Sequence, residues 1–524
     1  MAGLPAKPEN GSPMPQSYIK RILDARVYDV ARETPIDEAT LMSRRFNNRV
    51  WLKREDLQPV FSFKLRGAYN KMSRLSPEQA GKGVVAASAG NHAQGVAMAA
   101  QKLNIKATIV MPRTTPQIKV EAVRNRGARV VLHGDSFDEA SVYARKLVDE
   151  KSMTYVHPFD DPDVIAGQGT IGMEIVRQHQ QPLDALFVPV GGGGLLAGVA
   201  AYVRYVWPDT RIVGVEPEDA ACLKLAMDRG RRATLPEVGL FADGCAVAQV
   251  GKENFRVIRN TVDEVITIST DEMCAAIKDI FEDTRSIAEP AGALALAGLK
   301  KYVEHTGVSG QQLLAIVSGA NTNFDRLRYI SERTETGEHR EAVISVTLPE
   351  EPGSFRAFCS VLGRRNITEF NYRYADTSSA QVFVGLSVVP GGEDLADLLA
   401  DLGERGYVTE DMTNNEVAKL HIRYMVGGHA PEVIENERVY RVEFPERPGA
   451  LLGFLSGLGH RWNISMFHYR NHGAAYGRIL VGVQLPKSDR SAFEEILRGI
   501  NFPYWEETDN RAYQLYLGKR KDQA

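Results

Sequence analysis

The stretch GVVAASAGNHAQGVAMAAQKLN (83–104) decides the fold class, because it places a short apolar strand directly before an amphipathic helix. The same order recurs twice in the segment that follows (107–150), as ATIVMP with PQIKVEAVRNRG and as ARVVLHG with SFDEASVYARKLVDE. Short buried strands that alternate with helices are typical of a parallel sheet covered on both faces. The alternation returns at 185–217 and 311–327. Residues 17–330 are therefore predicted to form a two-lobed, doubly wound α/β body.

A duplicated segment follows the body. VTLPEEPGSFRAFCSVLGRRNITEFNYRY starts at Val346 and VEFPERPGALLGFLSGLGHRWNISMFHYRN starts at Val442, and the two copies align once Trp462 is taken as an insertion. Each copy predicts a strand, a Pro-Glu-x-Pro-Gly turn, a helix and a strand, followed by further strand and helix patterns. This order indicates two ferredoxin-like α+β modules of the split βαβ type.

Shifts in composition give the predicted domain boundaries. The polar segment after the body, SERTETGEHREA, is predicted to be a linker. The full division is a disordered lead (1–16), the body (17–330), the linker (331–341), the first module (342–414), a connecting segment (415–436), the second module (437–508) and a tail (509–524).

The composition excludes several classes of protein. The 524 residues are 44% hydrophobic and 25% charged with a net charge of −3, and no basic stripe is present, which argues against nucleic-acid and membrane-surface binding. No apolar run is long enough to span a bilayer. The four cysteines are far apart, so neither a zinc site nor a disulfide framework is predicted. We expect a cytoplasmic protein.

One lysine has an unusual setting. In PVFSFKLRGAYNKM (59–72), Lys64 follows two phenylalanines, Phe61 and Phe63. Lys64 is either a surface charge whose stem packs on the rings, or a buried amine whose pKa is lowered so that it can form a Schiff base. Taken alone, this stretch leaves both interpretations open.

Three loops of the body follow predicted strands, the position at which open parallel sheets bind ligands. In the first, SAGNHAQG, Ser88 and Asn91 are either helix caps or ligand contacts: the helix N–H groups suit an anion and the Asn91 amide suits a ring oxygen. In the third, VSGANTN, Ser318 is either a turn residue or a hydroxyl facing a ring nitrogen.

The second loop, VPVGGGGLLAG, carries four consecutive glycines whose backbone can wrap an anion. It also contains a passable dinucleotide fingerprint, because Gly192, Gly194 and Ala197 satisfy G-x-G-x-x-A and Glu216 ends the next strand. A dinucleotide explains the glycines but not Lys64. A lysine, an anion cradle, an amide for a ring oxygen and a hydroxyl for a ring nitrogen are together what pyridoxal 5'-phosphate (PLP) needs.

Five motifs, SFKLRGAY, SAGNHAQGVA, PVGGGGLLAG, AEPAGALALAG and VSGANTN, together resemble the β-eliminating PLP enzymes of the tryptophan-synthase-β fold (fold type II). With the duplicated tail, the chain is most similar to the biosynthetic threonine dehydratases, or threonine ammonia-lyases. The resemblance implies that L-threonine, and L-serine more weakly, is deaminated by β-elimination, L-threonine giving 2-oxobutanoate and ammonia as the first committed step of isoleucine biosynthesis.

The resemblance also implies residue roles. Lys64 would form the Schiff base with PLP, Asn91 would bind the ring oxygen of PLP, and Ser318 would face its pyridine nitrogen. Ser88 and Asn91 would bind the substrate carboxylate. The residues that would bind the phosphate are Gly191, Gly192, Gly193, Gly194 and Leu195. Glu289 of AEPAGA is expected near the ring or as a helix-start glutamate, and no role is assigned to it.

The duplicated modules resemble the ACT-like regulatory domains of this family, which implies inhibition by isoleucine, activation by valine and a homotetramer. Gly353 and Gly449 open helices whose free N–H groups suit an amino-acid carboxylate, and Asn366 and Asn463 suit its amino group. The modules are alternatively a structural appendage for oligomerisation.

No divalent metal site is predicted. The serine-racemase relatives bind a divalent cation beside a strand end resembling GVEPEDAACLK, but Cys222 here replaces an acidic ligand, and a monovalent ion stays open. His92 is expected to be a packed loop histidine. The rival functions are a serine racemase or dehydratase, a threonine synthase, a nicotinamide-dependent dehydrogenase, and a non-enzymatic amino-acid sensor.

Overall fold

The computed structural model describes two compact units, which divide between Thr334 and Glu335. The described residues are 16–324, 326–337, 340–363, 365–373, 379–389, 393–415, 418, 434–445, 450–458, 461–470, 476–500, 502–510, 513–514 and 517–518. Nearly all of the predicted lead (1–16), most of the connecting segment (415–436) and much of the tail (509–524) therefore lie outside the description. The first unit is here called the body and the second the regulatory unit.

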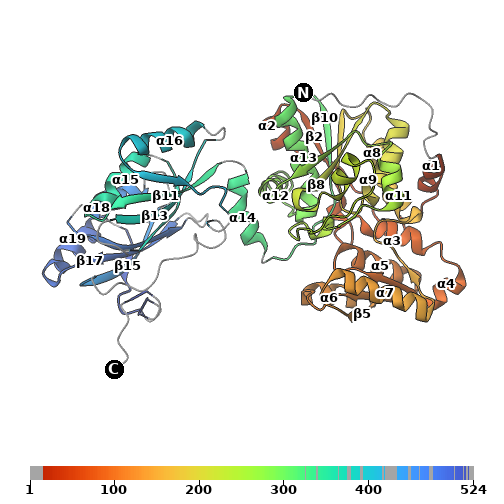
Figure 1. Cartoon of the computed structure of the whole chain (residues 1–524), viewed down its shortest axis with the longest axis horizontal. Helices are drawn as coiled ribbons and strands as arrows, with labels where there is room; N and C mark the ends of the chain where they lie inside the picture. Colours follow the sequence, from red (N-terminus) through yellow and green to blue (C-terminus); the bar gives the residue numbers. More distant parts are fainter. Residues whose placement is uncertain are drawn as a thin grey trace. The chain divides into compact units, whose positions relative to one another are not determined.

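The smaller lobe of the body is a four-stranded parallel sheet in the order β5-β4-β3-β6 (Figure 1). Helix α7 packs on one face, and α5 and α6 cover the other. The bounds are α4 Pro77–Lys82, β3 Val84–Ala87, α5 Asn91–Leu103, β4 Ala107–Met111, α6 Gln117–Arg124, β5 Arg129–Leu132, α7 Phe137–Lys151 and β6 Thr154–Tyr155. The strand–helix alternation predicted from 83 to 150 is confirmed.

The larger lobe contains a six-stranded sheet in the order β1-β2-β10-β7-β8-β9, in which only the edge strand β1 runs antiparallel among the described strands. The bounds are α1 Gln16–Leu23, β1 Ile36–Glu38, α2 Thr40–Phe46, β2 Arg49–Arg54, α3 Lys64–Met72, α8 Pro162–Gln178, β7 Ala185–Pro189, α9 Gly194–Val206, β8 Arg211–Pro217, α10 Cys222–Asp228, α11 Lys252–Ile258, β9 Glu264–Ile268, α12 Thr270–Thr284, α13 Pro290–Thr306 and β10 Gln312–Val317.

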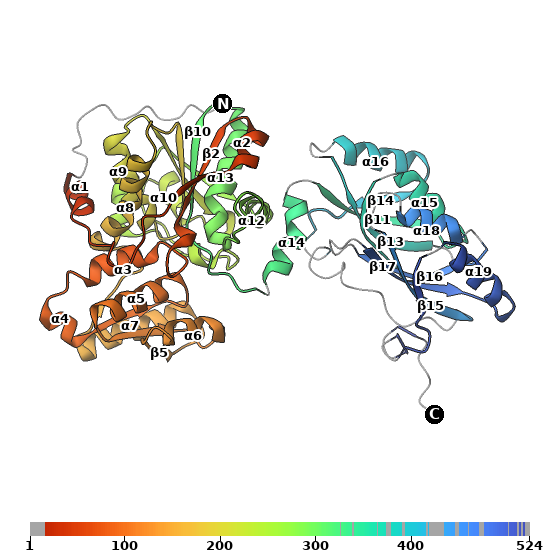
Figure 2. The ribbon, with the colours of Figure 1, turned by 180° about the vertical axis from the view of Figure 1, so that it is seen from behind.

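Alternate residues of the central strands face two helical layers, as the two-residue period of a strand requires. Leu186 of β7 and Leu314 of β10 pack with α8, α9 and α11, whereas Phe187 and Leu313 pack with α2, α12 and α13. Both views of the ribbon show α8 and α9 on one side of the sheet and α2, α12 and α13 on the other (Figure 1; Figure 2). Because β10, β7 and β8 are parallel neighbours, their carboxyl ends share one edge.

The predicted linker (331–341) differs from the structure. Helix α14 spans Arg326–Gly337, so the first part of this segment is helical. Ile330 and Thr334 are buried, Arg333 Nε donates to Asp271 Oδ1 at 2.5 Å, and the Thr334 hydroxyl donates to the Cys274 carbonyl at 3.2 Å. The polar composition hid these contacts, because charged residues that pair with the body look the same in sequence as solvated ones.

The regulatory unit confirms the internal repeat. Each copy is a βαββαβ module, and the two share one eight-stranded sheet in the order β14-β11-β13-β12-β16-β17-β15-β18, joined where β12 pairs antiparallel with β16. The bounds are β11 Glu341–Pro349, α15 Ser354–Leu362, β12 Ile367–Arg373, β13 Ser379–Ser387, α16 Glu393–Glu404, β14 Val408–Asp411, β15 Glu437–Pro445, α18 Ala450–Leu458, β16 Ile464–Arg470, β17 Tyr476–Gln484, α19 Arg490–Ile500 and β18 Tyr504–Glu506.

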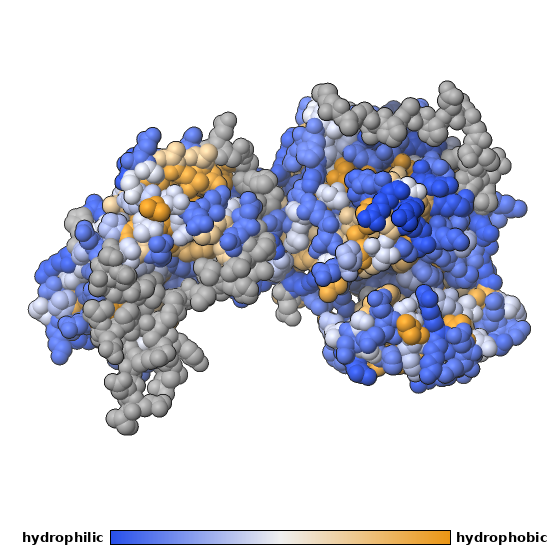
Figure 3. Space-filling model, viewed as in Figure 1, coloured by the Kyte–Doolittle hydropathy of each residue, from blue (hydrophilic) through white to orange (hydrophobic). Residues whose placement is uncertain are grey.

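The surface fits the sequence composition. Hydrophilic side chains cover much of the outer face of the body seen in Figure 3, with apolar ones scattered among them. Within the described part of the chain, no helix combines the length and the apolar character needed to cross a membrane.

Candidate active site and effector pocket

The segment before α3 holds Lys64 over the carboxyl end of β10. The Phe63 N–H donates to the Ser318 carbonyl at 3.3 Å, and the Ala320 N–H donates to the Phe61 carbonyl at 2.9 Å. Lys64 is the first residue of α3, and Gly95 of α5 packs so closely on it that an added Cβ would lie 3.0 Å from the Lys64 carbonyl carbon. The lysine thus lies where the smaller lobe meets the strand ends.

The Lys64 amine has little to stabilise its charge. Nζ donates to the Pro158 carbonyl at 2.9 Å and lies 5.3 Å from the centroid of the Phe63 ring. Burial lowers the pKa of Lys64 to about 8, although Cys245 and Glu289 act in the opposite direction. The N-terminal end of α3 carries a partial positive charge, which disfavours the protonated form of Lys64 at this position. About a tenth of the amine is therefore neutral at pH 7, against less than about a thousandth for a lysine of ordinary pKa.

Only one of the two phenylalanines that precede Lys64 is buried. Phe63 is buried, but Phe61 is 53% exposed and has a left-handed φ of 55°. The bond from the Ala320 N–H to the Phe61 carbonyl holds the backbone there and turns the ring outward.

The glycine loop after β7 forms a cradle without side chains. A Cβ on Gly192 would lie 2.2 Å from the Phe159 ring, and one on Gly194 would lie 2.8 Å from the Phe159 carbonyl oxygen. Gly193 has a φ of 90°, which glycine alone adopts without strain. Among the described residues, no hydrogen bond is donated by the N–H groups from Gly191 to Leu195. These free donors at the start of α9 suit a phosphate.

The dinucleotide interpretation of this loop is wrong. Glu216 is fully buried, and its carboxylate accepts the N–H groups of Leu223 and Lys224 at 2.8 Å each. Burial raises the pKa of Glu216 to about 7. A carboxylate that caps α10 in this way does not present itself to a ribose.

Ser88 and Asn91 lie half-buried on the smaller lobe, and neither caps α5. Its N-cap is Gly90, whose N–H donates to the Ser88 hydroxyl at 3.3 Å. The Asn91 amide instead reaches across to the larger lobe, where its Nδ2 donates to Glu289 Oε1 at 2.5 Å and its Oδ1 accepts from Asn321 Nδ2 at 2.6 Å. Ser318 is buried, and its hydroxyl donates to the Ala291 carbonyl at 3.2 Å.

These contacts bring Lys64, Asn91, the glycine loop and Ser318 to one site between the lobes. The segment Pro158–Phe159 links two of them, because it receives the Lys64 amine and packs against the glycines. Sequence reasoning missed these two residues, whose contacts are a backbone carbonyl and a ring. It also missed Asn321, although the amide-rich motif VSGANTN was a usable signal.

The residues weighed as metal ligands have other partners. His92 is buried with Nε2 2.8 Å from the Val156 carbonyl oxygen, and burial lowers its pKa to about 3. The Cys222 thiol donates to the Gly191 carbonyl at 3.5 Å. No cluster of three or more metal-ligating side chains occurs among the described residues. The absence of a divalent site stays a prediction.

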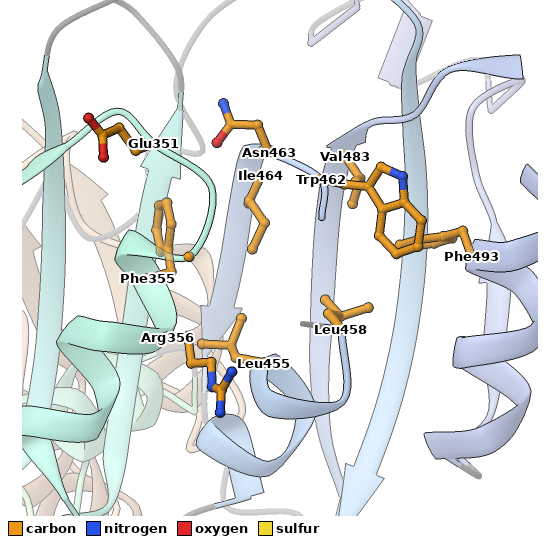
Figure 4. Close-up of a pocket in the computed structure, with 11 residues that line it drawn as sticks. Glu351, Phe355, Arg356, Leu455, Leu458, Trp462, Asn463, Ile464, Val483 and Phe493 are labelled. Atoms are coloured by element: carbon orange, nitrogen blue, oxygen red, sulfur yellow. The ribbon is translucent and has the colours of Figure 1, made fainter. Parts of the chain in front are cut away.

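A cleft in the regulatory unit lies between the two modules (Figure 4). Its volume, with the open mouth included, is about 410 Å³. Glu351 and Asn463 lie at one end and Arg356 at the other, with apolar side chains between them. The lining residues are Glu351, Gly353, Phe355, Arg356, Leu455, Leu458, Trp462, Asn463, Ile464, Val483 and Phe493.

The cleft unites two of the four predicted effector positions, and they come from different modules. Gly353 is the N-cap of α15 with a φ of 96°, and Asn463 precedes β16. Asn463 Nδ2 donates to Glu350 Oε1 at 2.9 Å. Asn366 does not line this cleft, and Gly449 lies outside the described residues.

The two-lobed fold, the half-buried lysine of lowered pKa and the glycine cradle define a PLP-dependent enzyme. A family model of pyridoxal-phosphate-dependent enzymes matches residues 27–319, and one of the C-terminal regulatory domain of threonine dehydratase matches 332–422 and 429–517. The chain belongs to the biosynthetic threonine dehydratases, the PLP-dependent threonine ammonia-lyases.

Individual relatives agree along the whole chain. It is 56% identical to the biosynthetic L-threonine dehydratase IlvA of Burkholderia multivorans over 95% of this chain and 99% of that one, and 50% identical to its Escherichia coli namesake over 98% and 99%. Among solved structures, the processed threonine deaminase isoform 2 of Solanum lycopersicum is 50% identical with a TM-score of 0.60, covering 60% of this chain and 92% of that one.

Proposed function

We propose that the site between the lobes deaminates L-threonine, and L-serine more weakly, to the 2-oxo acid and ammonia, under inhibition by isoleucine and activation by valine. The observation that carries the proposal is the convergence of a low-pKa lysine, a row of free N–H donors, an amide and a hydroxyl at one site between the lobes. We also propose that the chain acts as a cytoplasmic homotetramer, which a light-scattering mass would test.

Each group has a part in holding the cofactor. The N–H groups from Gly191 to Leu195 would bind its phosphate, Asn91 its ring oxygen, Ser318 its ring nitrogen and Lys64 its aldehyde carbon. When bound, the cofactor delocalises the electron pair left at Cα after deprotonation. Ser318 is a neutral hydroxyl, so it does not hold a proton on the ring nitrogen as a carboxylate would.

The protein groups supply the proton transfer and the substrate binding. Neutral Lys64 Nζ accepts the Cα proton of threonine, for which a pKa of about 8 is well matched near neutral pH. Ser88, Asn91 and the N–H groups at the start of α5 bind the substrate carboxylate. Serine differs from threonine by one methyl group, which costs about 1–3 kcal/mol of discrimination.

The cleft between the modules is the proposed effector site. The N–H groups at the start of α15 suit a carboxylate, and Asn463 Oδ1 and the Glu351 carboxylate suit an ammonium group. Leu455, Leu458 and Ile464 offer apolar surface to a branched aliphatic side chain. Regulation requires that the effector bind two states of the enzyme unequally.

The test is 2-oxo-acid release from L-threonine and from L-serine, each with and without isoleucine and valine. We expect turnover of threonine, a kcat/KM for serine that is roughly 10- to 200-fold lower, suppression by isoleucine and relief by valine. Asn463→Ala should weaken the response to isoleucine, whereas Asn366→Ala, the matching change outside the cleft, should not. The reverse pattern would place the effector elsewhere.

A further inference from the structure

Glu289 is a buried carboxylate for which the proposed reaction has no use. It occupies the N-cap position of α13 and is 3% exposed, yet its side chain makes no capping hydrogen bond to that helix. A helix-start glutamate with only a structural role behaves differently: Glu272 of α12 accepts the Ser269 N–H at 2.7 Å in a capping box. Glu289 instead faces the site and accepts from Asn91.

A chain of hydrogen bonds decides which way the Asn91 amide points. Asn321 Nδ2 lies 2.8 Å from the Val60 carbonyl oxygen, which can only accept, so the amide of Asn321 has a single consistent orientation. The same Nδ2 then donates to Asn91 Oδ1. This bond turns Asn91 Nδ2 toward Glu289, an acceptor.

The Glu289 side chain is itself held in place. The backbone N–H of Glu289 donates to the Gly319 carbonyl at 3.1 Å. Gly319 has no room for a side chain, because a Cβ there would lie 2.4 Å from Glu289 Oε1. Burial, followed by the charge of Asp243, raises the pKa of Glu289 to about 7, while Asn91 and Lys119 act in the opposite direction. In both protonation states a carbonyl oxygen remains to accept from Asn91.

We propose that Glu289 is a positioning residue for the cofactor: it binds one Nδ2 hydrogen of Asn91 and thereby holds the other available for the cofactor's ring oxygen. An amide nitrogen carries two hydrogens, and the structure accounts for one of them. Glu289 therefore acts through Asn91, and among the described residues its side chain forms no hydrogen bond with the phosphate cradle or with Ser318. The inference rests on the proposed role of Asn91.

The test is a double-mutant cycle on PLP affinity in the full-length apo-protein, measured by titration with PLP and by the visible absorbance of the complex. We expect Asn91→Ala and Glu289→Ala each to weaken binding about tenfold or more and to move the absorbance maximum. The double variant should be no weaker than Asn91→Ala, because both changes remove one interaction. Glu289→Gln keeps an acceptor oxygen and should restore binding to within about threefold. Glu272→Gln, the matched helix-start control, should match the unmodified protein.

Each other outcome is informative. Additive losses from Asn91→Ala and Glu289→Ala would overturn the inference, because Glu289 would then act independently. Failure of Glu289→Gln to restore binding, with an unchanged thermal midpoint, would overturn it as well. Normal PLP affinity in Asn91→Ala would instead refute the proposed role of Asn91, and with it the proposed cofactor contacts.

Discussion

Two lysines of the body, the buried Lys53 and the half-buried Lys64, differ in their surroundings. Lys53 Nζ is fully buried and donates to Glu174 Oε2 at 2.7 Å, to the Thr34 carbonyl at 2.6 Å and to Gln178 Oε1 at 3.0 Å. Burial lowers the pKa of Lys53, while Glu174 and Glu55 offset part of that effect. Lys64 Nζ has one carbonyl partner and no carboxylate within ion-pair distance among the described residues.

The Lys53 region is a closed network of balanced charge. Arg66, also fully buried, donates to Glu55 at 2.8 Å and to Glu174 at 2.6 Å, so two cations face two carboxylates. Buried groups that are paired in this way hold elements together and keep their charges. The comparison indicates that the partners of a shielded lysine, and in particular its carboxylates, decide whether it is structural or reactive.

The largest expected effect comes from removing the reactive lysine. Lys64→Ala should lower kcat/KM for threonine by at least about 10³-fold, because it deletes both the cofactor attachment and the proposed base. The thermal midpoint of the apo-protein should not fall, since no ion pair is lost. A variant with near-normal turnover would show that another group performs the reaction.

Removing the paired lysine should reverse that pattern. Lys53→Met leaves Glu174 with one cation and removes a donor from the Thr34 carbonyl and from Gln178 Oε1, so we expect a loss of about 3 kcal/mol in the free energy of unfolding of the body. Urea denaturation measures the loss, and kcat of the folded fraction should be unchanged. Lys82→Met, in the exposed Lys82–Glu78 pair, is the control and should leave the urea midpoint where it was. Equal midpoints for both variants would contradict the comparison.

The glycine cradle can be filled directly. Gly192→Ala puts a methyl group into the Phe159 ring, which must move, so we expect PLP affinity to fall by about tenfold or more. Gly81→Ala, where nothing lies within 4 Å of the added Cβ, is the matched control. Equilibrium titration of the apo-protein with PLP distinguishes them. Normal binding in Gly192→Ala would mean that the cradle does not hold the phosphate as proposed.

Local patterns made most of the fold predictable. The strand–helix alternation from 83 to 150, the four glycines and the internal repeat are all periodic or short-range features, and each confirmed element lies close to its predicted range. The order of strands in the large sheet was beyond reach, because β2 and β10 are neighbours only through tertiary packing.

The unpredicted parts of the site depend on contacts between distant segments. Pro158 matters through a carbonyl oxygen that any residue carries, so its type gives no signal. Gly353 and Asn463 were each found, but their meeting in one cleft follows from the pairing of β12 with β16. The network around Arg66 was missed as well, because charges that pair inside the body resemble surface charges in sequence.

The last expected effect is a pH dependence of stability that follows from the lowered pKa of Lys64. The pKa of Lys64 is about 8 in the folded protein against an ordinary 10.5, so between these values the unfolded chain binds more protons than the folded one. Lys64 therefore destabilises the folded protein by its full amount well below pH 8, and this destabilisation disappears as the pH rises toward 10.5. Apo-protein should be less stable than apo-Lys64→Met at pH 7, and the difference in urea midpoint should shrink by pH 10. Other titrating groups are common to both proteins and largely cancel. A difference that stays constant or grows with pH would mean that Lys64 keeps its ordinary pKa, and the contrast with Lys53 would then rest on geometry alone.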